Sequence, residues 1–588
     1  MAVQGLKTLS FFLFLTVGFV TSAYSQCSII EVSLEKRVQS ASLILEGRVK
    51  DIDSHWNKDK TMIYTSNKIE VYKVFKGQID KAEITVITIG GIIDDVMVKT
   101  SNLLSLNLNE VGVFFLMPAV AEKLNSQNNQ GNSYEAFSSK QGFINYQEQQ
   151  GEAIDLFTNY GHPNQLHLNI IQLSGQTVKE IKSYSYLGNA SKKMHGASPL
   201  ISDFFPETLS AGTKSRLTIR GKGFGTNPKV KFSNADDGGK TKIEPLLKQY
   251  ISSSDVEIVV EVPENAGTGK IQVYNGSIST SSKSLEIKYA YSNVPESDIQ
   301  ARFYNQSGGG YTWQMHPDFD KNADAKSAFL RAFEKWRCST LVNWNLGVNT
   351  LIDKQEKDNV NVIRFDRENN LPDGVLGTCF NYYSQCENGK WYVSELDIVF
   401  DDKTNWNYST ATSIGNRYDM ETIALHELGH GQQLGHVINS KDLMHYSVCP
   451  GIVKRELNQN NLACANLVLN NSTQSEICNF RPMSLLTQDI CDDISAGYFD
   501  FDEIKAYPNP FNSETQISYQ IASETNVQAE IFDLFGNKLY TLANEIQFPG
   551  RHVYNLNGFQ SDMSNGLYVF TLYLNGTLKT KKILKVNN

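Results

Sequence analysis

The chain has 588 residues and a formal net charge of −9. Its length allows about three to five domains, each with its own core, and its acidity argues against a nucleic-acid partner, whose phosphates need basic surfaces. Aromatic residues make up 11% of the chain, a share that, with abundant Asn, Gln, Ser and Thr, favours β-rich exported modules.

Residues 1–25 have the pattern of a signal peptide. Lys7 precedes an apolar run over 9–20, and the small residues Ala23 and Ser25 stand at the −3 and −1 positions of a cleavage site. The run is too short to span a membrane comfortably, and no later segment reaches transmembrane length. We therefore expect a mature chain that is secreted or held at the cell surface and has no transmembrane segment.

Residues 26–190 are expected to form an all-β, barrel-like module. Three short segments alternate apolar and polar side chains with the period of two that strands require: 43–49, 69–75 and 84–88. A cysteine at the mature start, a helix-like stretch and then strands together weakly resemble the barrel of netrin-like and tissue-inhibitor domains.

Residues 198–291 resemble an IPT/TIG domain, which implies an immunoglobulin-like β-sandwich. The resemblance is carried by glycines at strand ends and by the strands between them: Phe205-Pro206, Ala211-Gly212, Leu217 to Gly221, Gly223-Phe224-Gly225, Val230 to Phe232, Val262-Pro263 and Gly267 to Gly269. We expect the domain to be a spacer that positions the domain after it. Specific binding of carbohydrate or protein is the alternative.

Residues 298–493 are expected to form an α+β domain. The patterns predict strands at 311–315, 360–365 and 396–400, and a helix whose apolar stripe contains Ala325, Phe329, Phe333 and Trp336. A second helix follows, which Asp419 can cap, with Met420 in its first turn.

Four polar residues before the first helix alternate as in a calcium loop: Asp318, Asp320, Asn322 and Asp324. The sixth position of such a loop needs glycine and the twelfth an acid, but the chain has Ala323 and Phe329 there. A polar loop with Asp324 as helix cap is therefore favoured, and Ca²⁺ remains an alternative.

The second helix carries His426 and His430, one turn apart on the same face, so both rings can reach one metal ion. Glu427 stands next to the first histidine, where it can take a proton from water and pass it to a leaving amine. His436 follows six residues after His430, and a continuous helix would turn it about 600° and raise it about 9 Å. The helix must therefore end and the chain fold back.

This run resembles the extended HExxHxxGxxH motif of the metzincin metallopeptidases, in which a third histidine completes a zinc site. The resemblance implies zinc held by His426, His430 and His436. The family's turn glycine is replaced by Gln433. A left-handed residue with a Cβ costs about 1 to 2 kcal/mol, so either Gln433 bears that strain or the turn has moved to a neighbouring glycine, 431 or 435.

The segment after the motif resembles the methionine turn of the same family, in its matrixin and astacin branches. Met444 would lie beneath the metal, eight residues after His436. Tyr446, two residues later, is implied as a group that stabilises the oxyanion. His445 is expected to support the site from outside; if His436 fails as a ligand, His445 or Asp442 would replace it.

Export permits disulfides, and seven of the eight cysteines fall around the zinc motif: Cys338, Cys379, Cys386, Cys449, Cys464, Cys478 and Cys491. Sequence does not determine their pairing, although Cys379 with Cys386 is the easiest loop closure. The odd number leaves Cys27, which could pair with one of them or hold the enzyme latent as a thiolate on zinc.

Residues 506–588 closely resemble the C-terminal sorting domain of the type IX secretion system. The residues that carry this resemblance are Tyr507 to Phe511, Ile531 to Gly536, Gly566 to Tyr568 and Lys579 to Val586. They imply a small β-sandwich, the type IX machinery as a partner, and passage through the outer membrane of a Gram-negative host.

Together these resemblances imply a secreted zinc-dependent endopeptidase with Glu427 as general base and a protein or peptide substrate. The substrate backbone would pair with an edge strand near Asp397. The alternative is an exported adhesion or scaffold protein with a structural zinc site, which binds through the IPT/TIG domain. Sequence does not indicate the cleavage preference or the oligomeric state.

Overall fold

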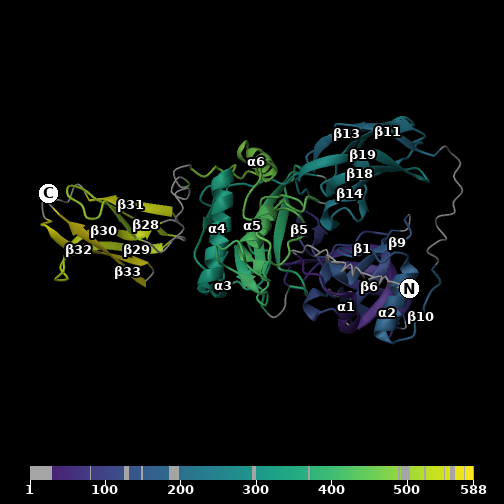
Figure 1. The fold of residues 1–588 in the computed structure, drawn as a ribbon, viewed down its shortest axis with the longest axis horizontal. Coiled ribbons are helices and arrows are strands. Elements are labelled where there is room, and N and C mark those ends of the chain that lie inside the picture. Colours follow the sequence, from purple (N-terminus) through teal and green to yellow (C-terminus); the bar gives the residue numbers. More distant parts are fainter. Residues whose placement is uncertain are drawn as a thin grey trace, which may run out of the picture.

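A computed structural model gives the structure of the protein and describes residues 29–79, 81–124, 132–147, 150–184, 198–294, 299–367, 371–487, 491, 504–521, 525–547, 550–556, 563–574 and 577–586. The chain is multidomain and mostly β, with few helices (Figure 1). The expected signal peptide and Cys27 lie outside the described residues. No helix among the described residues is long and apolar enough to cross a membrane.

The N-terminal module is a β-sheet flanked by two helices. Its main elements are α1 (Leu34–Ser40), β1 (Leu43–Trp56), β2 (Ile63–Lys76), β3 (Glu83–Ile89), β6 (Val111–Pro118), β7 (Ser133–Ala136), β8 (Phe143–Gln147), β9 (Glu152–Ile154), α2 (Pro163–Ser174) and β10 (Lys179–Glu180). The strands follow the order β1-β2-β3-β7-β6-β8-β9, and β1 also pairs with β6. The three predicted strands lie within β1, β2 and β3, which confirms them.

The second body consists of two packed sheets. One has the order β11 (Leu200–Phe205), β13 (Arg216–Lys222), β17 (Glu257–Glu261), β16 (Tyr250–Ser253); the other has β12 (Thr208–Ala211), β19 (Ile278–Ala290), β18 (Ala266–Tyr274), β14 (Lys229–Asn234), β15 (Lys242–Ile243). Inward-facing residues such as Leu217, Val230 and Ile258 form one buried cluster between the sheets. A short 3₁₀ turn, η4 (Ala235–Asp237), follows β14.

The central body holds a mixed sheet of the order β21 (Trp344–Leu346), β20 (Tyr311–Met315), β22 (Asn361–Phe365), β24 (Trp391–Phe400), β23 (Gly377–Gln385). Its other elements are α3 (Pro317–Lys321), α4 (Ala323–Thr340), β25 (Trp406–Asn407), β26 (Tyr418–Asp419), α5 (Met420–Gly431) and α6 (Gln459–Thr473). Helices α4 and α5 pack against each other, and Trp336 of α4 donates its indole N–H to the carbonyl of Leu425 at 2.9 Å. Both predicted helices and the three predicted strands are present.

The expectation that the strand near Asp397 lies at the edge of the sheet is wrong. Asp397 lies in β24, which pairs with β22 on one side and β23 on the other. Strand β23 is antiparallel to β24 and lies at the margin of this domain's own strands. Two strands of the N-terminal module, β5 (Val96–Thr100) and β4 (Gly91–Ile93), continue the sheet beyond β23, giving it seven strands from two domains.

The C-terminal body has a three-stranded and a four-stranded sheet. The first has the order β27 (Lys505–Tyr507), β28 (Gln516–Ile521), β31 (Gly550–Asn555); the second has β30 (Lys538–Gln547), β29 (Thr525–Phe532), β32 (Gly566–Leu574), β33 (Thr577–Lys585). They share a buried cluster that includes Ile517, Ile531 and Phe570. This body lies at the far end of the molecule from the N-terminal module (Figure 1).

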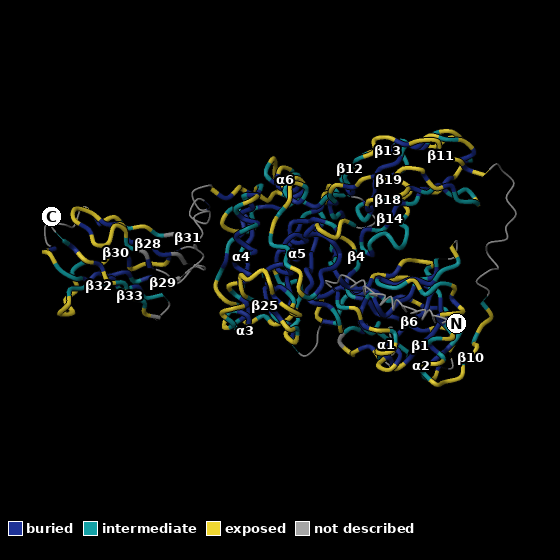
Figure 2. Tube along the Cα trace, viewed as in Figure 1, coloured by how far each residue is buried: buried dark blue, intermediate teal, exposed yellow. Residues whose placement is uncertain are grey.

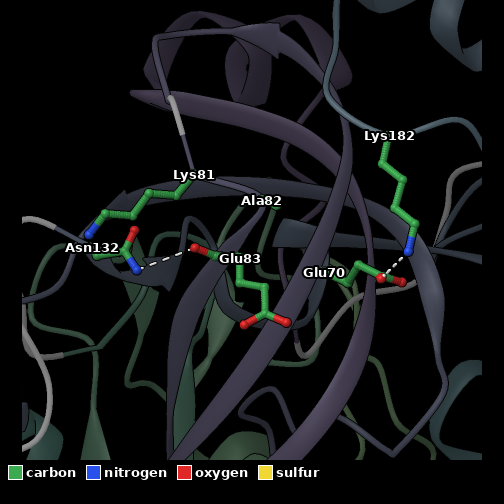
Figure 3. Close-up of a pocket in the computed structure, with 6 residues that line it drawn as sticks. All are labelled: Glu70, Lys81, Ala82, Glu83, Asn132 and Lys182. Atoms are coloured by element: carbon green, nitrogen blue, oxygen red, sulfur yellow. Dashed lines mark hydrogen bonds and ion pairs between the residues drawn. The ribbon is translucent and has the colours of Figure 1, made fainter.

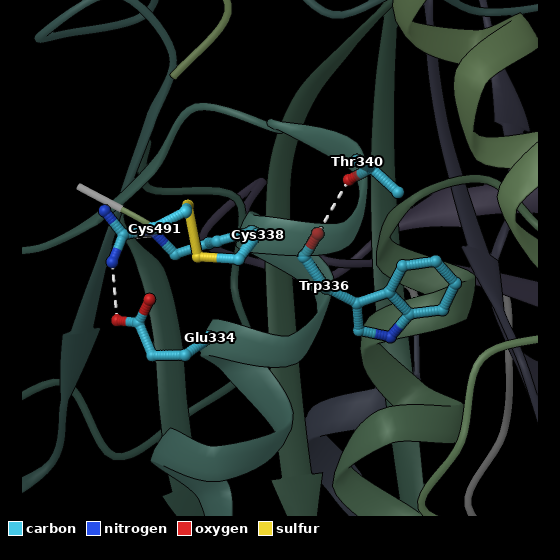
Figure 4. The surroundings of a disulfide bond; sticks show 6 residues. Glu334, Trp336, Cys338, Thr340 and Cys491 are labelled. Atoms are coloured by element: carbon cyan, nitrogen blue, oxygen red, sulfur yellow. Dashed lines mark hydrogen bonds and ion pairs between the residues drawn. A yellow bond between two sulfur atoms is a disulfide. The ribbon is translucent and has the colours of Figure 1, made fainter. Parts of the chain in front are cut away.

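Two disulfides join distant parts of the central domain. Cys338 of α4 is bonded to Cys491 (Figure 4), and Cys386 to Cys478. The easiest loop closure, Cys379 with Cys386, is therefore not the one that forms. Cys379 lies on β23 with its side chain in the core, where burial raises the pKa of its thiol well above the usual value.

The four residues that resemble a calcium loop have other roles in the structure. Asp318 pairs with Arg367, and Asp320 pairs with Lys326 at 2.7 Å. Asn322 accepts the backbone N–H of Ala325 and so caps α4. The predicted cap, Asp324, lies inside the first turn instead.

One surface pocket of about 550 Å³ lies in the N-terminal module (Figure 3). It is lined by Glu70, Lys81, Ala82, Glu83, Asn132 and Lys182. Glu70 and Lys182 form an ion pair across it. Helix α5 of the central domain lies away from this pocket and is buried along its whole length (Figure 2).

Candidate metal centre

Helix α5 begins where the sequence predicts. The side chain of Asp419 accepts the backbone N–H of Thr422 at 3.1 Å, which satisfies one of the free amides of the first turn. Arg455 pairs with the same carboxylate. Every residue of the helix is buried, so His426 and His430 project into the interior of the protein.

The helix ends at Gly431, and Gln433 makes the turn. Its φ is 65°, whereas glycines 431 and 435 have no positive φ, so the first of the two expected solutions holds. The side chain of Gln433 accepts a hydrogen bond from the hydroxyl of Tyr383 at 2.8 Å and donates one to Asn381 at 2.9 Å. Both partners lie on β23, so the glutamine ties the loop between His430 and His436 to that strand.

We expect Gln433→Gly to destabilise the domain although glycine suits the backbone better. Glycine relieves about 1 to 2 kcal/mol of left-handed strain, but it leaves two buried hydrogen-bond partners unpaired at about 1 to 3 kcal/mol each. Equilibrium urea unfolding followed by tryptophan fluorescence should show a net loss of about 1 to 3 kcal/mol.

Lys60→Gly is the matched control for this substitution. Lys60 has a similar φ of 58°, but its side chain is exposed. Glycine there relieves the same kind of strain without removing a buried side-chain hydrogen bond, so stability should be kept or should rise slightly. A Gln433→Gly protein as stable as wild type would show that the two side-chain bonds contribute little.

The fold brings the three predicted histidines together. Nε2 of His430 lies 3.0 Å from Nε2 of His426 and 3.1 Å from Nε2 of His436. Nitrogen ligands about 2.0 to 2.1 Å from one tetrahedral ion would be separated by about 3.3 Å. The three Nε2 atoms therefore have the spacing of ligands that share one ion, and among the described residues they form the one such group of three or more His, Cys, Asp or Glu side chains.

The remaining ring nitrogens are held by acceptors. Nδ1 of His426 lies 2.8 Å from the carbonyl of Leu443, and Nδ1 of His430 lies 2.8 Å from the carbonyl of Leu434. A proton on Nδ1 leaves the lone pair of Nε2 available for a metal. Burial, and after it the nearby ring of His436, lowers the pKa of His426 to about 3. The ring is therefore neutral, as a metal ligand must be.

The third histidine has a different partner. Nδ1 of His436 lies 2.7 Å from Oδ1 of Asp236, which is in η4 of the second body. Asp237 steadies that turn by accepting the backbone N–H groups of Gly239 and Thr241. A carboxylate in this position fixes the ring and strengthens it as a ligand. The second body therefore contacts the candidate metal centre directly through Asp236. Neither role expected for residues 198–291, spacer or binding domain, included such a contact.

We expect Asp236→Ala to weaken zinc binding about 10- to 100-fold, the usual cost of losing such an outer hydrogen bond. Competition against a chromophoric chelator measures the dissociation constant without any substrate. Asp203→Ala removes an exposed carboxylate from the same body and should leave the constant unchanged. Equal zinc affinity in both variants would show that Asp236 does not support His436.

Glu427 is fully buried and has two partners from the N-terminal module. The hydroxyl of Ser101 donates to its Oε2 at 2.9 Å, and the amide of Asn102 donates to its Oε1 at 3.0 Å. Burial raises the pKa of Glu427 to about 7, although these hydrogen bonds oppose that effect. A carboxyl group that titrates near neutrality can both take and return a proton.

The segment after the histidines lies beneath α5. Met444 is 1% exposed, and a side-chain carbon added at Gly429 would meet its sulfur at 2.5 Å. Asp442 accepts the backbone N–H of Met444 and the side-chain amide of Asn461, both at 2.9 Å. Nδ1 of His445 lies 3.1 Å from the carbonyl of Val437. Met444 thus packs against α5 at Gly429, while His445 and Asp442 are outside the group of three histidines.

Tyr446 lies against the second body. Nζ of Lys240 donates to its hydroxyl at 3.2 Å, and a side-chain carbon at Gly238 would come within 2.9 Å of its ring. The loop that carries Asp236 therefore also holds the predicted oxyanion helper.

Sequence reasoning missed three residues of this centre: Ser101, Asn102 and Asp236. They lie 326, 325 and 200 positions from their partners Glu427, Glu427 and His436. No periodicity or short motif marks them, and only the folding of separate modules against one another brings them to the site.

Comparison with protein families identifies three regions of the chain. Residues 199–291 match the IPT/TIG domain, residues 303–464 match the matrixin family, and residues 505–586 match the secretion system C-terminal sorting domain. The sorting domain indicates a protein that is secreted or held at the cell surface.

Two curated relatives are plant enzymes. Metalloendoproteinase 2-MMP of Arabidopsis thaliana is 28% identical over 153 residues, which are 25% of this chain and 37% of the relative. Metalloendoproteinase 1-MMP of the same plant is 28% identical over 148 residues, 25% of this chain and 38% of the relative. The chain thus spans less than two fifths of the length of either.

Among solved structures, PorZ of Porphyromonas gingivalis is 18% identical, with a TM-score of 0.12 over 15% of this chain and 12% of PorZ. Dimeric latent PorU of the same organism is 13% identical, with a TM-score of 0.13 over 66% of this chain and 33% of PorU. Such low scores support no conclusion about this protein. The family matches do, and the chain carries an IPT/TIG domain, a matrixin domain of the metzincin type and a type IX secretion sorting domain, in that order.

Proposed function

We propose that the protein is a secreted zinc-dependent endopeptidase that hydrolyses extracellular proteins. The observation that supports this most is the convergence of three Nε2 atoms, those of His426, His430 and His436, on the segment that also carries Glu427. Zinc bound there would supply Lewis-acid polarisation of the scissile carbonyl and of the attacking water. The relatives named above are metalloendoproteinases, which agrees with this chemistry.

The residues of the chain have separate roles in this proposal. Glu427 takes the proton of the attacking water and returns it to the leaving amine. Asp236 keeps the ring of His436 in the orientation that presents Nε2. Tyr446 stabilises the oxyanion that forms from the carbonyl, and Met444 forms the floor under the histidines without touching the substrate.

The proposed domain limits are 1–25 for a signal peptide, 26–190 for the N-terminal module, 198–291 for the IPT/TIG domain, 298–493 for the peptidase and 506–588 for the sorting domain. The last would bring the protein to the type IX machinery. We propose no calcium site, because Asp318, Asp320 and Asn322 all have other partners.

Hydrolysis of casein and gelatin by the purified protein tests the proposal. The intact chain and the product of limited proteolysis are both assayed, since other modules contact the site. We expect cleavage that 1,10-phenanthroline stops and added zinc restores. Absence of cleavage in both forms at full zinc occupancy would favour an adhesion or scaffold protein with a structural zinc site.

A further inference from the structure

The proposed active centre has almost no access to solvent. His426 and Glu427 are 0% exposed, His436 is 4% and His430 is 7%. A peptidase must admit an extended peptide to its metal and its general base. Whatever covers this centre in the structure would therefore have to move before a substrate could bind.

A strand of the N-terminal module lies along the margin of the central sheet. Strand β5 lies antiparallel to β23, with Val96 opposite Ser384, Val98 opposite Tyr382 and Thr100 opposite Phe380. Backbone hydrogen bonds close both ends of the pairing, from the N–H of Ser101 to the carbonyl of Cys379 at 3.1 Å and from the N–H of Gln385 to the carbonyl of Asp95 at 2.7 Å. Addition of an extended segment to a sheet margin is a common mode of peptide recognition.

The chain that follows β5 reaches the general base. Ser101 and Asn102 each bind one oxygen of Glu427, as described above. The amide of Asn102 also donates to the carbonyl of Gly377 at 3.0 Å, and the hydroxyl of Ser101 accepts the N–H of Cys379 at 3.0 Å. Both side chains thus link the start of β23 to α5, across the space that a peptide would need.

Apolar contacts and one ion pair hold this strand in place. Val98 and Leu103 share a buried cluster with Phe380, Tyr382 and Val399 of the central domain. On the other side, Nζ of Lys99 lies 2.6 Å from Glu264, 2.8 Å from the hydroxyl of Ser292 and 3.0 Å from the carbonyl of Asn293. The second body therefore helps to hold β5 in its position beside β23, through these contacts of Lys99.

We infer that residues 96–102 are a built-in inhibitor that occupies the peptide-binding margin of β23 and withholds Glu427 from water and substrate. This inference rests on the proposed peptidase function and adds its regulation and its substrate-binding surface. The inhibition acts on the general base through Ser101 and Asn102 and requires no cysteine thiolate on zinc. The substrate is then an extended peptide that replaces β5 along β23, in the same antiparallel direction.

Binding of a tripeptide hydroxamate, Pro-Leu-Gly-NHOH, tests whether the site is covered, separately from hydrolysis. Apparent affinity falls in proportion to the fraction of molecules whose site is open. Lys99→Glu places a carboxylate beside Glu264 and should release β5. In the zinc-loaded full chain we expect this variant to bind the hydroxamate about tenfold more tightly than wild type, or better.

Lys283→Glu is the matched control. Lys283 also faces two carboxylates, Asp203 and Glu207, but on the exposed side of the second body. Its hydroxamate affinity should equal that of wild type. Equal affinity of Lys99→Glu and wild type, with zinc bound in both, would overturn the inference. Tight hydroxamate binding without peptide hydrolysis would support the inhibitor and refute the peptidase.

An engineered disulfide tests the same inference if the Lys99→Glu variant does not fold. Val96 and Ser384 are register partners, so Val96→Cys with Ser384→Cys can join β5 to β23 without removing a contact to Glu427. Oxidised, this protein should bind the hydroxamate more weakly than wild type, and mild reduction should restore wild-type binding. Wild-type affinity in the oxidised protein would show that β5 does not cover the site.

Discussion

Replacing Glu427 with alanine is expected to reduce peptide hydrolysis by about 10²- to 10⁴-fold, the usual contribution of a general acid–base group. The three histidines remain, so the protein should still bind one equivalent of zinc, measured by metal analysis after dialysis. The comparison is made in the most active form of the chain, the wild type or the Lys99→Glu variant. Loss of turnover with zinc retained would separate the proton-transfer role of Glu427 from any role in metal binding.

Glu456→Ala is the control for this experiment. Glu456 is largely exposed and pairs with Lys335 at 2.7 Å, and exposed pairs contribute little to stability. Its removal should change neither turnover nor zinc content. Turnover that persists in Glu427→Ala would refute the proposed mechanism, and loss of zinc in that variant would mean that the carboxylate belongs to the metal centre.

The second large effect is expected from His436→Ala. Its Nε2 lies 3.1 Å from that of His430, so the substitution should remove one of three ligands. We expect zinc affinity to fall more than about 100-fold, beyond the 10- to 100-fold loss expected for an outer hydrogen-bond partner. The same chelator competition used for Asp236→Ala measures both constants, so the two variants can be ranked directly.

His445→Ala distinguishes the alternatives left open by the sequence. Its Nδ1 faces the carbonyl of Val437, and His445 is outside the group of three. Its substitution should change zinc affinity much less than that of His436. The reverse ranking would make His445 the third ligand and would contradict the arrangement described above.

Local chemistry explains why much of the centre was predictable. A cap at Asp419, a one-turn spacing of two histidines and a chain reversal after Gly431 are properties of a few adjacent residues. Even the strain at Gln433 follows from the absence of glycine at that position. What sequence did not show is how the strain is offset, because Tyr383 and Asn381 lie on a strand, 50 and 52 residues before Gln433.

Long-range placement was the part that failed. Strand β23 was not predicted, and Asp397 was placed at the margin of the sheet although it lies on the neighbouring strand β24. Nearly all of β23 is buried, so its side chains lack the alternation that marks a half-buried strand. The addition of β5 to that sheet depends on how two modules pack, which residue patterns within either module do not determine.

The disulfide pairing has the same explanation. Cys379 and Cys386 are close in sequence, but both lie on or just after an extended strand, where seven residues separate their side chains by about 20 Å. Cys386 instead meets Cys478, 92 residues later. Chain distance was a poor guide because the extended backbone keeps near neighbours apart.

The bond between Cys338 and Cys491 bears on where the protein reaches its full stability. It closes a loop across 153 positions, and in the chain-entropy model a loop of that size adds about 5 kcal/mol to stability. Such bonds form in oxidising compartments, so the matrixin domain should reach full stability only in a compartment of that kind. Both cysteines precede the sorting domain, which matches from residue 505, so the covalent loop includes no part of that domain.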